Sequence, residues 1–407
     1  MQPRTKSGGA GWALALLTVV YAFNFADRQL LSIALDDIKR DLEVSDAQMG
    51  WLTGTAFALF YTCAGIGIAR VADRGRRWTV LGVGLALWSA LTSLSGLARS
   101  FTDLALMRVG VGVGEAACTP PAHSLLSDLY APAKRATAIA VYSTGIYLGI
   151  FLAYDVGGWV CEQWSWRTAL VVFGLPGLPL AALAGFAMRE PRRESVAVAS
   201  RASTWADLRA LVTQATFVHL ALGAGIKSIA GYALSTWMPT FYGRVHGFGP
   251  LEAGAWLGPI LGLGGALGTF GGGWLADRLG RGAQRRRMQC AGGATLVALP
   301  FLYASLFVES SSASLALYAV ATVLGAMYLG PVFALTLNMV RPDQRALASA
   351  TLLFLINVIG LGLGPWLVGV LNDALAAQFG AQAVRWSLAL IAVTYAWGAA
   401  HMLRAAE

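Results

Sequence analysis

The chain carries the run Asp73-Arg74-Gly75-Arg76-Arg77 and, 204 residues later, the related run Asp277-Arg278-Leu279-Gly280-Arg281. Each run follows one long apolar segment and precedes another. A recurrence at half the chain length indicates that the two halves share one plan. The dense positive charge between apolar segments also indicates on which side of a membrane these loops lie.

The amino-acid composition is that of a membrane protein. The chain is 57% hydrophobic and 13% charged, with a mean hydropathy of +0.60. Soluble domains carry about 25% charged residues, so a water-soluble chain of 407 residues could not cover its surface with so few. The basic residues behind the net charge of +9 stand in short loops between apolar runs. This is the distribution that the positive-inside rule describes. We therefore expect no nucleic-acid partner.

The cysteines argue against a disulfide framework or a metal site, and the first apolar segment argues against a cleaved signal peptide. Three of the four cysteines lie inside apolar runs and none has metal-ligand spacing, so neither a disulfide framework nor a metal site is expected. The first apolar stretch, 12–35, is long and lacks a small-residue cleavage pattern. We expect it to be a retained membrane span and not a cleaved signal peptide.

About twelve segments are long and apolar enough to cross a bilayer, which takes about 20 residues each. They lie at 12–35, 46–69, 78–98, 103–129, 136–156, 166–188, 213–241, 250–275, 288–308, 313–338, 346–371 and 383–404. The longest polar interruption joins six spans to six spans. We therefore predict an all-α membrane protein with six-helix bundles at 1–188 and 212–407, connected by a cytoplasmic central loop at 189–211.

The arginines and lysines predict the orientation in the membrane. With a cytoplasmic N-terminus, 21 of the 30 Lys and Arg residues lie on the cytoplasmic side and six lie outside. The other three, Arg28, Arg108 and Lys227, lie within spans. This bias places both termini in the cytoplasm.

The duplication extends beyond the opening motif. The stretch 129–136 resembles 339–346, and each follows a proline-containing span. Gly157-Gly158-Trp159 resembles Gly364-Pro365-Trp366. Two parallel six-span halves with a basic central loop resemble the major facilitator superfamily. That resemblance implies twelve transmembrane helices in two pseudo-symmetric halves, which rock about a central site.

Two regions narrow the resemblance. The loop from Gly67 to Arg77 resembles the superfamily signature between spans two and three. The runs Arg108–Ala116 in span four and Asn24–Arg28 in span one resemble the spinster-type transporters in their bacterial form. This resemblance implies lysophospholipid or sphingoid-type cargo, coupling to a proton gradient and a bacterial inner membrane. The runs in span four and span one also resemble anion:cation symporters, so proton symport of small organic or sugar acids remains an alternative.

Charged residues inside spans are the candidate functional residues, because a charge in the bilayer is costly unless it faces a cavity or a partner. Asp27 and Glu115 are predicted to couple protons, and Arg28 to gate them or to bind an anion. Alternatively, these charges form a fixed network that only holds helices together. Arg108 and Glu115 stand seven residues apart, a rise of ~10 Å, so each needs a partner on another span, and span one is favoured.

Three other residues are candidates for gating or substrate binding: Arg108, Lys227 and His123. Lys227, inside span seven, is expected to bind an anionic headgroup or to neutralise an acidic residue. His123 either relays protons or packs as a hydrogen-bonded residue. The paired basic motifs are predicted to form a cytoplasmic latch, or only to enforce orientation. The latch residues are Asp73, Arg74, Arg77, Asp277 and Arg278.

The sequence contains no catalytic signature: no phosphate-cradling loop, no zinc-spaced set and no nucleophile elbow. We therefore expect a transporter and not an enzyme, with no cofactor or metal and with the proton gradient as its energy source. A membrane enzyme or a receptor without transport is the alternative of another class. The expected partners are a small amphipathic or anionic substrate and membrane lipid, and the chain is expected to act as a monomer.

Overall fold

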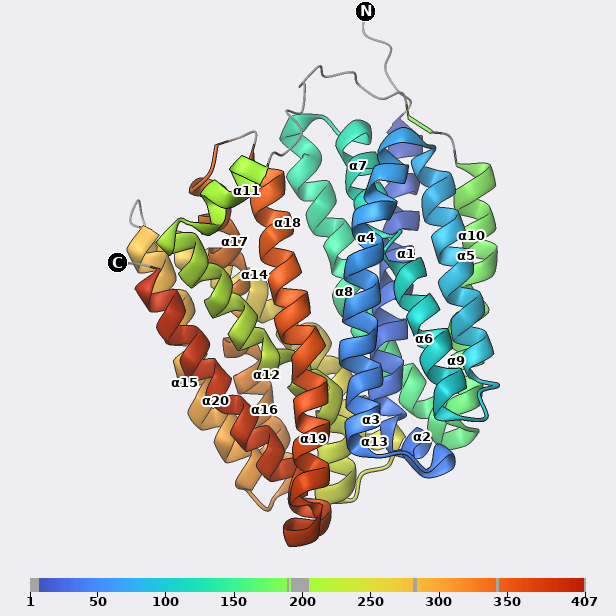
Figure 1. Ribbon diagram of the computed structural model, residues 1–407, viewed down its shortest axis with the longest axis vertical. Helices are drawn as coiled ribbons and strands as arrows, with labels where there is room; N and C mark the ends of the chain where they lie inside the picture. The colour runs from blue at the N-terminus through green and yellow to red at the C-terminus, as the bar shows by residue number, and fades with distance from the viewer. Residues whose placement is uncertain (1–6, 189, 192–204, 281–283, 342–343, 406–407) are drawn as a thin grey trace, which may run out of the picture. The chain divides into compact units, whose positions relative to one another are not determined.

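The computed structural model describes residues 7–188, 190–191, 205–280, 284–341 and 344–405. All regular elements in these ranges are helices (Figure 1). Ten helical stretches of the described chain are long and apolar enough to cross a membrane. One of them, Leu347–Arg404, has 58 residues, about twice what one crossing needs. The predicted span 103–129 is absent from the ten because its helix is interrupted.

The chain divides into two compact units. The first unit comprises Met1–Val44, Ala56–Glu194 and Gly249–Gly258. The second unit comprises Ser45–Thr55, Ser195–Phe248 and Pro259–Glu407. Each unit therefore holds one short segment from the other half of the sequence. We call Ser45–Thr55 and Gly249–Gly258 the exchanged segments.

The first unit is an all-helical bundle. Its helices are α1 (Ser7–Ile33), α2 (Leu35–Leu42), α4 (Phe57–Arg74), α5 (Arg77–Ser95), α6 (Phe101–Glu115), α7 (Thr119–Leu129), α8 (Pro132–Gln163), α9 (Trp166–Gly174), α10 (Gly177–Ala182), the π-helical turn η2 (Leu183–Ala187) and the exchanged α13 (Pro250–Pro259). Helix α1 packs along α8, and α5 packs against α6, α9 and α10 (Figure 1).

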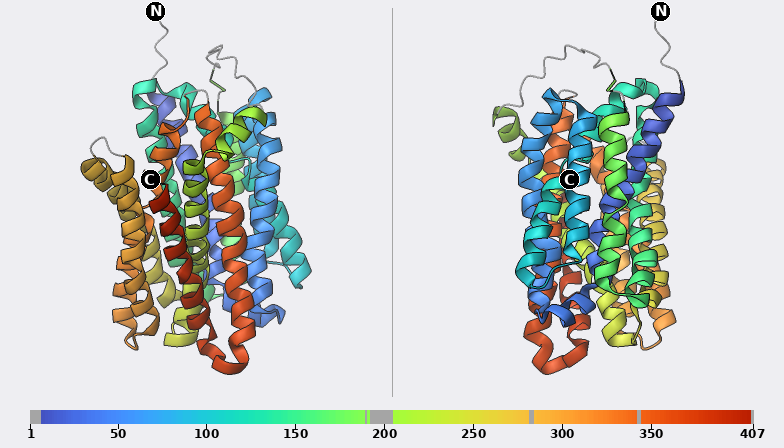
Figure 2. Two further views of the ribbon diagram at one scale, coloured as in Figure 1. Left: turned by 60° about the vertical axis from the view of Figure 1, so that its left-hand side comes forward. Right: turned by 90° about the vertical axis from the view of Figure 1, so that its right-hand side faces the viewer.

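The second unit is built in the same way. Its helices are the exchanged α3 (Asp46–Gly50) with the π-helical turn η1 (Trp51–Ala56), α11 (Trp205–Val212), α12 (Ala215–His246), η3 (Ile260–Gly264), α14 (Gly265–Gly280), α15 (Gln284–Phe307), α16 (Ser311–Ala326), α17 (Leu329–Asn338), α18 (Arg345–Leu355), η5 (Ile356–Leu361), α19 (Gly362–Phe379), the 3-10 turn η6 (Gly380–Gln382) and α20 (Ala383–Arg404). Helix α12 packs along α20, and the long helices of each unit run side by side (Figure 2).

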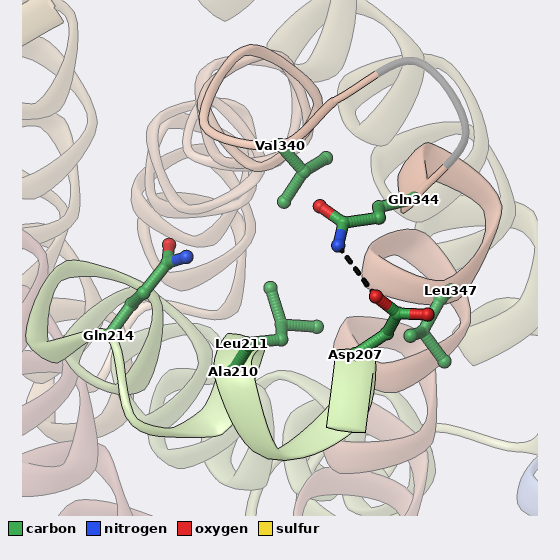
Figure 3. A pocket seen from close by; sticks show the side chains of 7 residues that line it. All are labelled: Asp207, Ala210, Leu211, Gln214, Val340, Gln344 and Leu347. Atoms are coloured by element: carbon green, nitrogen blue, oxygen red, sulfur yellow. Dashed lines mark hydrogen bonds between the residues drawn. The ribbon is translucent and has the colours of Figure 1, made fainter. Parts of the chain in front are cut away.

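The end of the predicted central loop is helical and packs on the second unit. Helix α11 places Leu211 in that unit's core. Beside it, the amide of Gln344 donates a hydrogen bond of 3.0 Å to the carboxylate of Asp207. Figure 3 shows this bond at the rim of a small hollow that Val340 and Leu347 also line. None of the predicted site residues lines this hollow.

The contact between α1 and α8 depends on glycine. A Cβ built on Gly149 would lie 2.3 Å from the carbonyl oxygen of Ala22, and one on Gly145 would lie 2.7 Å from that of Thr18. The two backbones therefore approach closely along this seam, as small residues allow in membrane helices. This packing holds α1, which carries the two charged candidate residues Asp27 and Arg28, against the rest of the unit.

We predict that Gly149→Ala destabilises the first unit by about 1–3 kcal/mol, because the added methyl group forces α1 away from α8. Thermal unfolding of the purified protein measures this. The matched control is Gly67→Ala on α4, where a Cβ would have no atom within 4 Å. Equal unfolding temperatures for the two variants would show that the α1–α8 seam tolerates separation.

Candidate functional site

One face of α1 carries three polar side chains inside the first unit. Asn24, Asp27 and Arg28 are spaced three and four residues apart, so they lie one above another on the helix. Asn24 is fully buried and Asp27 is 4% exposed. Facing them is α6, which carries Arg108 and Glu115 two turns apart, both buried.

The first ion pair joins Asp27 to Arg108. The Arg108 guanidinium donates to one carboxylate oxygen of Asp27 at 2.8 Å, and the hydroxyl of Thr92 on α5 donates to the other at 2.6 Å. Three helices thus meet at one carboxylate. Because both partners are nearly inaccessible, the pair is protected from water, and the loss of either charge would leave the other unpaired in a low-dielectric environment.

The second ion pair joins Arg28 to Glu115. The Arg28 Nε donates to a Glu115 oxygen at 2.6 Å. Glu115 is fully buried, whereas the Arg28 side chain is 13% exposed. The guanidinium also lies 4.6–5.0 Å from the ring centroids of Phe25, Phe57 and Tyr61, distances at which a cation is attracted to a ring face. Arg28 is therefore held between one carboxylate and an aromatic surface.

Both pairs cross from α6 to α1, which is the span named as the candidate to hold the partners of Arg108 and Glu115. The glycines of α6 make this possible. A Cβ on Gly114 would lie 2.9 Å from the carbonyl oxygen of Gly84 and from the backbone nitrogen of Trp88. Helix α6 therefore lies directly against α5, and its long charged side chains extend toward α1 and not into lipid.

Several polar atoms at this site have no hydrogen-bond partner among the described residues. They are both amide atoms of Asn24, the second carboxylate oxygen of Glu115 and the Nε of Arg108. An unsatisfied buried polar group costs about 1–3 kcal/mol. These atoms can still form hydrogen bonds next to the buried carboxylate of Glu115. Such surroundings suit a group that gains and loses a proton.

His123 is separated from this charge cluster by a break in the helix. Helix α6 ends at Glu115, α7 begins at Thr119, and Pro120 and Pro121 in its first turn lack the N–H groups that would continue the helix. The eight-residue spacing that suggested a shared face with Glu115 assumes an unbroken helix. The His123 side chain is exposed and its ring lies 5.5 Å from that of Tyr142, edge to face.

Lys227 lies inside the second unit on α12. It is 5% exposed, and its ammonium lies 4.2 Å from the Tyr328 ring centroid and 4.7 Å from that of Tyr395. No carboxylate pairs with it among the described residues of that unit. The aromatic rings stabilise the cation in part, so Lys227 keeps the capacity to meet an anion.

The predicted latch residues divide into separate groups. Arg77 is buried and bonds the carboxylates of Asp128 and Glu190, the latter at 2.6 Å, all within the first unit. Asp277 pairs with Arg287 at 3.2 Å. Arg278 lies over the Trp274 ring. The side chains of Asp73 and Arg74 lie outside the described residues, so the latch stays a prediction.

Thr92 and Phe57 contribute to the charge cluster and were missing from the predicted site. Thr92 holds Asp27, and Phe57 lies against both Arg28 and Arg108. Thr92 is a polar residue in an apolar span, which is a usable signal when a neighbouring span carries an acid. Nothing in the sequence distinguishes Phe57 from the many other aromatic residues in spans.

The chain is similar to known membrane proteins over most of its length. The model of the Major Facilitator Superfamily matches residues 17–365. An "MFS-type efflux pump" of Mycolicibacterium smegmatis is 36% identical over 383 residues, covering 93% of this chain and 88% of that protein. The "Sphingosine-1-phosphate transporter SPNS2" of Xenopus tropicalis is 28% identical over 380 residues, covering 89% and 73%.

A solved structure agrees with these relatives. The crystal structure of a bacterial homolog of the human lysosomal transporter Spinster, in an inward-facing and unoccupied conformation, has a TM-score of 0.90 and 30% identity. The match covers 98% of each chain. Sequence and fold therefore point to one family.

Proposed function

Because this chain belongs to the major facilitator superfamily and is a multi-pass membrane transporter related to the spinster proteins, we propose that it couples protons to the movement of amphipathic lipids. The cargo is of the lysophospholipid or sphingoid type. The observation that carries the proposal is the Arg28–Glu115 pair, in which a fully buried carboxylate holds a partly exposed guanidinium. We further propose a bacterial inner membrane with both termini cytoplasmic.

The proposed coupling arises because the Glu115 carboxylate and an anionic headgroup compete for Arg28. A proton that reaches a Glu115 oxygen neutralises the carboxylate and weakens its bond to the guanidinium. Arg28 then becomes available to an anionic headgroup. When the headgroup leaves and Arg28 returns to Glu115, the proton is expelled. Proton and anion therefore favour each other's binding, and by linkage the apparent affinity for an anionic substrate rises as pH falls.

The surroundings of Arg28 support a lipid over a sugar acid. Its neighbours are one carboxylate and three aromatic rings, which suit an ionic head attached to an apolar body. A sugar-acid site needs several side chains that hydrogen-bond hydroxyl groups. In the second unit, Lys227 is also a cation beside aromatic rings, those of Tyr328 and Tyr395. We propose it as a second contact for an anionic group.

We expect a lysophospholipid to drive proton uptake into proteoliposomes that contain a trapped pH-sensitive dye. Sugar acids at the same concentration should give no signal. Protein-free liposomes exposed to the same lysolipid control for membrane disturbance. Proton uptake with sugar acids but not with lysolipid would replace the lipid assignment by the symporter alternative. No proton uptake with either class of compound would contradict proton-coupled transport of both.

A further inference from the structure

The ends of three helices of the second unit lie together. Asp277 on α14 pairs with Arg287 on α15 at 3.2 Å, and the two helices pack against each other. Helix α20 ends beside them (Figure 1), since a Cβ on Gly292 of α15 would lie 2.9 Å from the side chain of Leu403. The last turns of α14 and α20 and the first turn of α15 therefore form one surface of this unit.

This surface is strongly positive. The three helices contain one acid, Asp277, which already pairs with Arg287. Exposed arginines without a carboxylate partner among the described residues lie around this pair, and we call them the basic patch: Arg278, Arg285, Arg286 and Arg404. The first turn of α15 holds arginines and no acid, although the helix dipole favours acids there. An anion bound at the patch would relieve this repulsion.

The equivalent place in the first unit is neutralised from within. An offset of 210 residues aligns Arg76-Arg77-Trp78 with Arg286-Arg287-Met288. Arg77 is buried and bonds two carboxylates, one of which is that of Asp128. The same offset places Asn338 at the position of Asp128. The positive-inside rule explains basic loops in both halves, but not why this counter-charge is present in only one of them.

The exposed face of α14 has the polarity profile of a phospholipid. Leu267, Phe270 and Trp274 are each more than half exposed. They are followed by Arg278 at the same spacing of three or four residues, so the four lie on one face. The Arg278 guanidinium lies 5.1 Å from the centroid of the Trp274 ring. The face is thus apolar, then aromatic, then cationic, and tryptophan favours the level of the lipid headgroups.

The neighbouring helix α15 continues this profile. Gly293 and Val297 follow Arg286 at helical spacing, on the same face. Val297 is 52% exposed, and a Cβ on Gly293 would have no atom within 4 Å. This part of α15 is therefore open to an acyl chain below its arginines.

We propose that the basic patch binds the phosphate of an anionic phospholipid of the surrounding bilayer. The phosphate meets Arg278, Arg285 and Arg286, because guanidinium groups form paired hydrogen bonds with phosphate oxygens, and the acyl chains lie along α14 and α15. Basic clusters at the ends of membrane helices attract such headgroups. This lipid is a resident of the second unit and not cargo, so the inference rests neither on proton coupling nor on the transported substrate.

Native mass spectrometry of the protein in a neutral detergent tests this directly. Phosphatidylglycerol and phosphatidylcholine with identical acyl chains are titrated separately, and the affinity for the first lipid bound is measured. We expect phosphatidylglycerol to bind more tightly. The double variant Arg285→Gln with Arg286→Gln should weaken its binding about 30-fold, equivalent to ~1 kcal/mol for each arginine. Binding of phosphatidylcholine should not change, which also shows that the variant is folded.

Arg70→Gln with Arg76→Gln is the matched control, because it removes two exposed arginines from the corresponding region of the first unit. It should keep the wild-type affinity for phosphatidylglycerol. Equal affinity of the wild type for the two lipids, or an equal loss in the two double variants, would overturn the proposal. Displacement of phosphatidylglycerol by an equal concentration of glycerol phosphate would show that the patch takes a free phosphate ester, and the lipid assignment would fail.

Discussion

Glu115→Gln should reduce proton-driven transport to the level of protein-free liposomes. Glutamine keeps the shape of the side chain and a hydrogen-bond acceptor for Arg28, but it cannot take up a proton. The variant should still exchange labelled substrate across the membrane when no pH gradient is applied, because Arg28 remains beside its aromatic neighbours.

Asp103→Asn is the matched control for this experiment. Asp103 lies in the first turn of the same helix, where its carboxylate accepts a bond from the backbone of Arg99, away from the buried pairs. It should transport normally. If Glu115→Gln keeps the full pH dependence of the wild type, the fixed-network interpretation of the charge cluster holds and the proton assignment of Glu115 fails.

Arg108→Met should destabilise the folded protein by about 3–5 kcal/mol, because it leaves the Asp27 carboxylate buried without its counter-charge. Thr92 alone remains bonded to that carboxylate, and one hydroxyl does not replace a guanidinium. Thermal unfolding followed by tryptophan fluorescence measures the effect in detergent.

The double variant Asp27→Asn with Arg108→Met separates charge from packing. With both charges removed, most of the lost stability should return, since a neutral pair has no unpaired charge to bury. If Arg108→Met alone is as stable as the wild type, Asp27 is uncharged or solvated in the folded protein. Its place in the paired cluster would then be wrong.

The sequence predicted the helical membrane fold because apolar spans, basic loops and an internal repeat are each local or periodic signals. The spacing of Arg108 and Glu115 also predicted that each pairs with a residue on another span, and span one was the candidate. Which acid meets which base was not predictable, because Asp27 and Arg28 are adjacent and the choice depends on how α1 is rotated about its axis.

Two other features depend on contacts far apart in the chain. The exchanged segments look like ordinary starts of spans, and only tertiary packing places Ser45–Thr55 in the second unit. The break between α6 and α7 was indicated by Pro120 and Pro121, yet its effect on the direction of His123 needed the actual backbone. Thr92 and Phe57 join the cluster through α5 and α4, whose sequences carry no charge there.

The most direct test of proton coupling is net lysolipid movement in proteoliposomes that start with equal lysolipid on both sides and an imposed pH gradient. The account predicts accumulation on one side, and accumulation on the opposite side when the gradient is reversed. It also predicts no net movement in Glu115→Gln under either gradient. Lysolipid that equilibrates at the same rate and to the same ratio with either gradient or none would contradict the account.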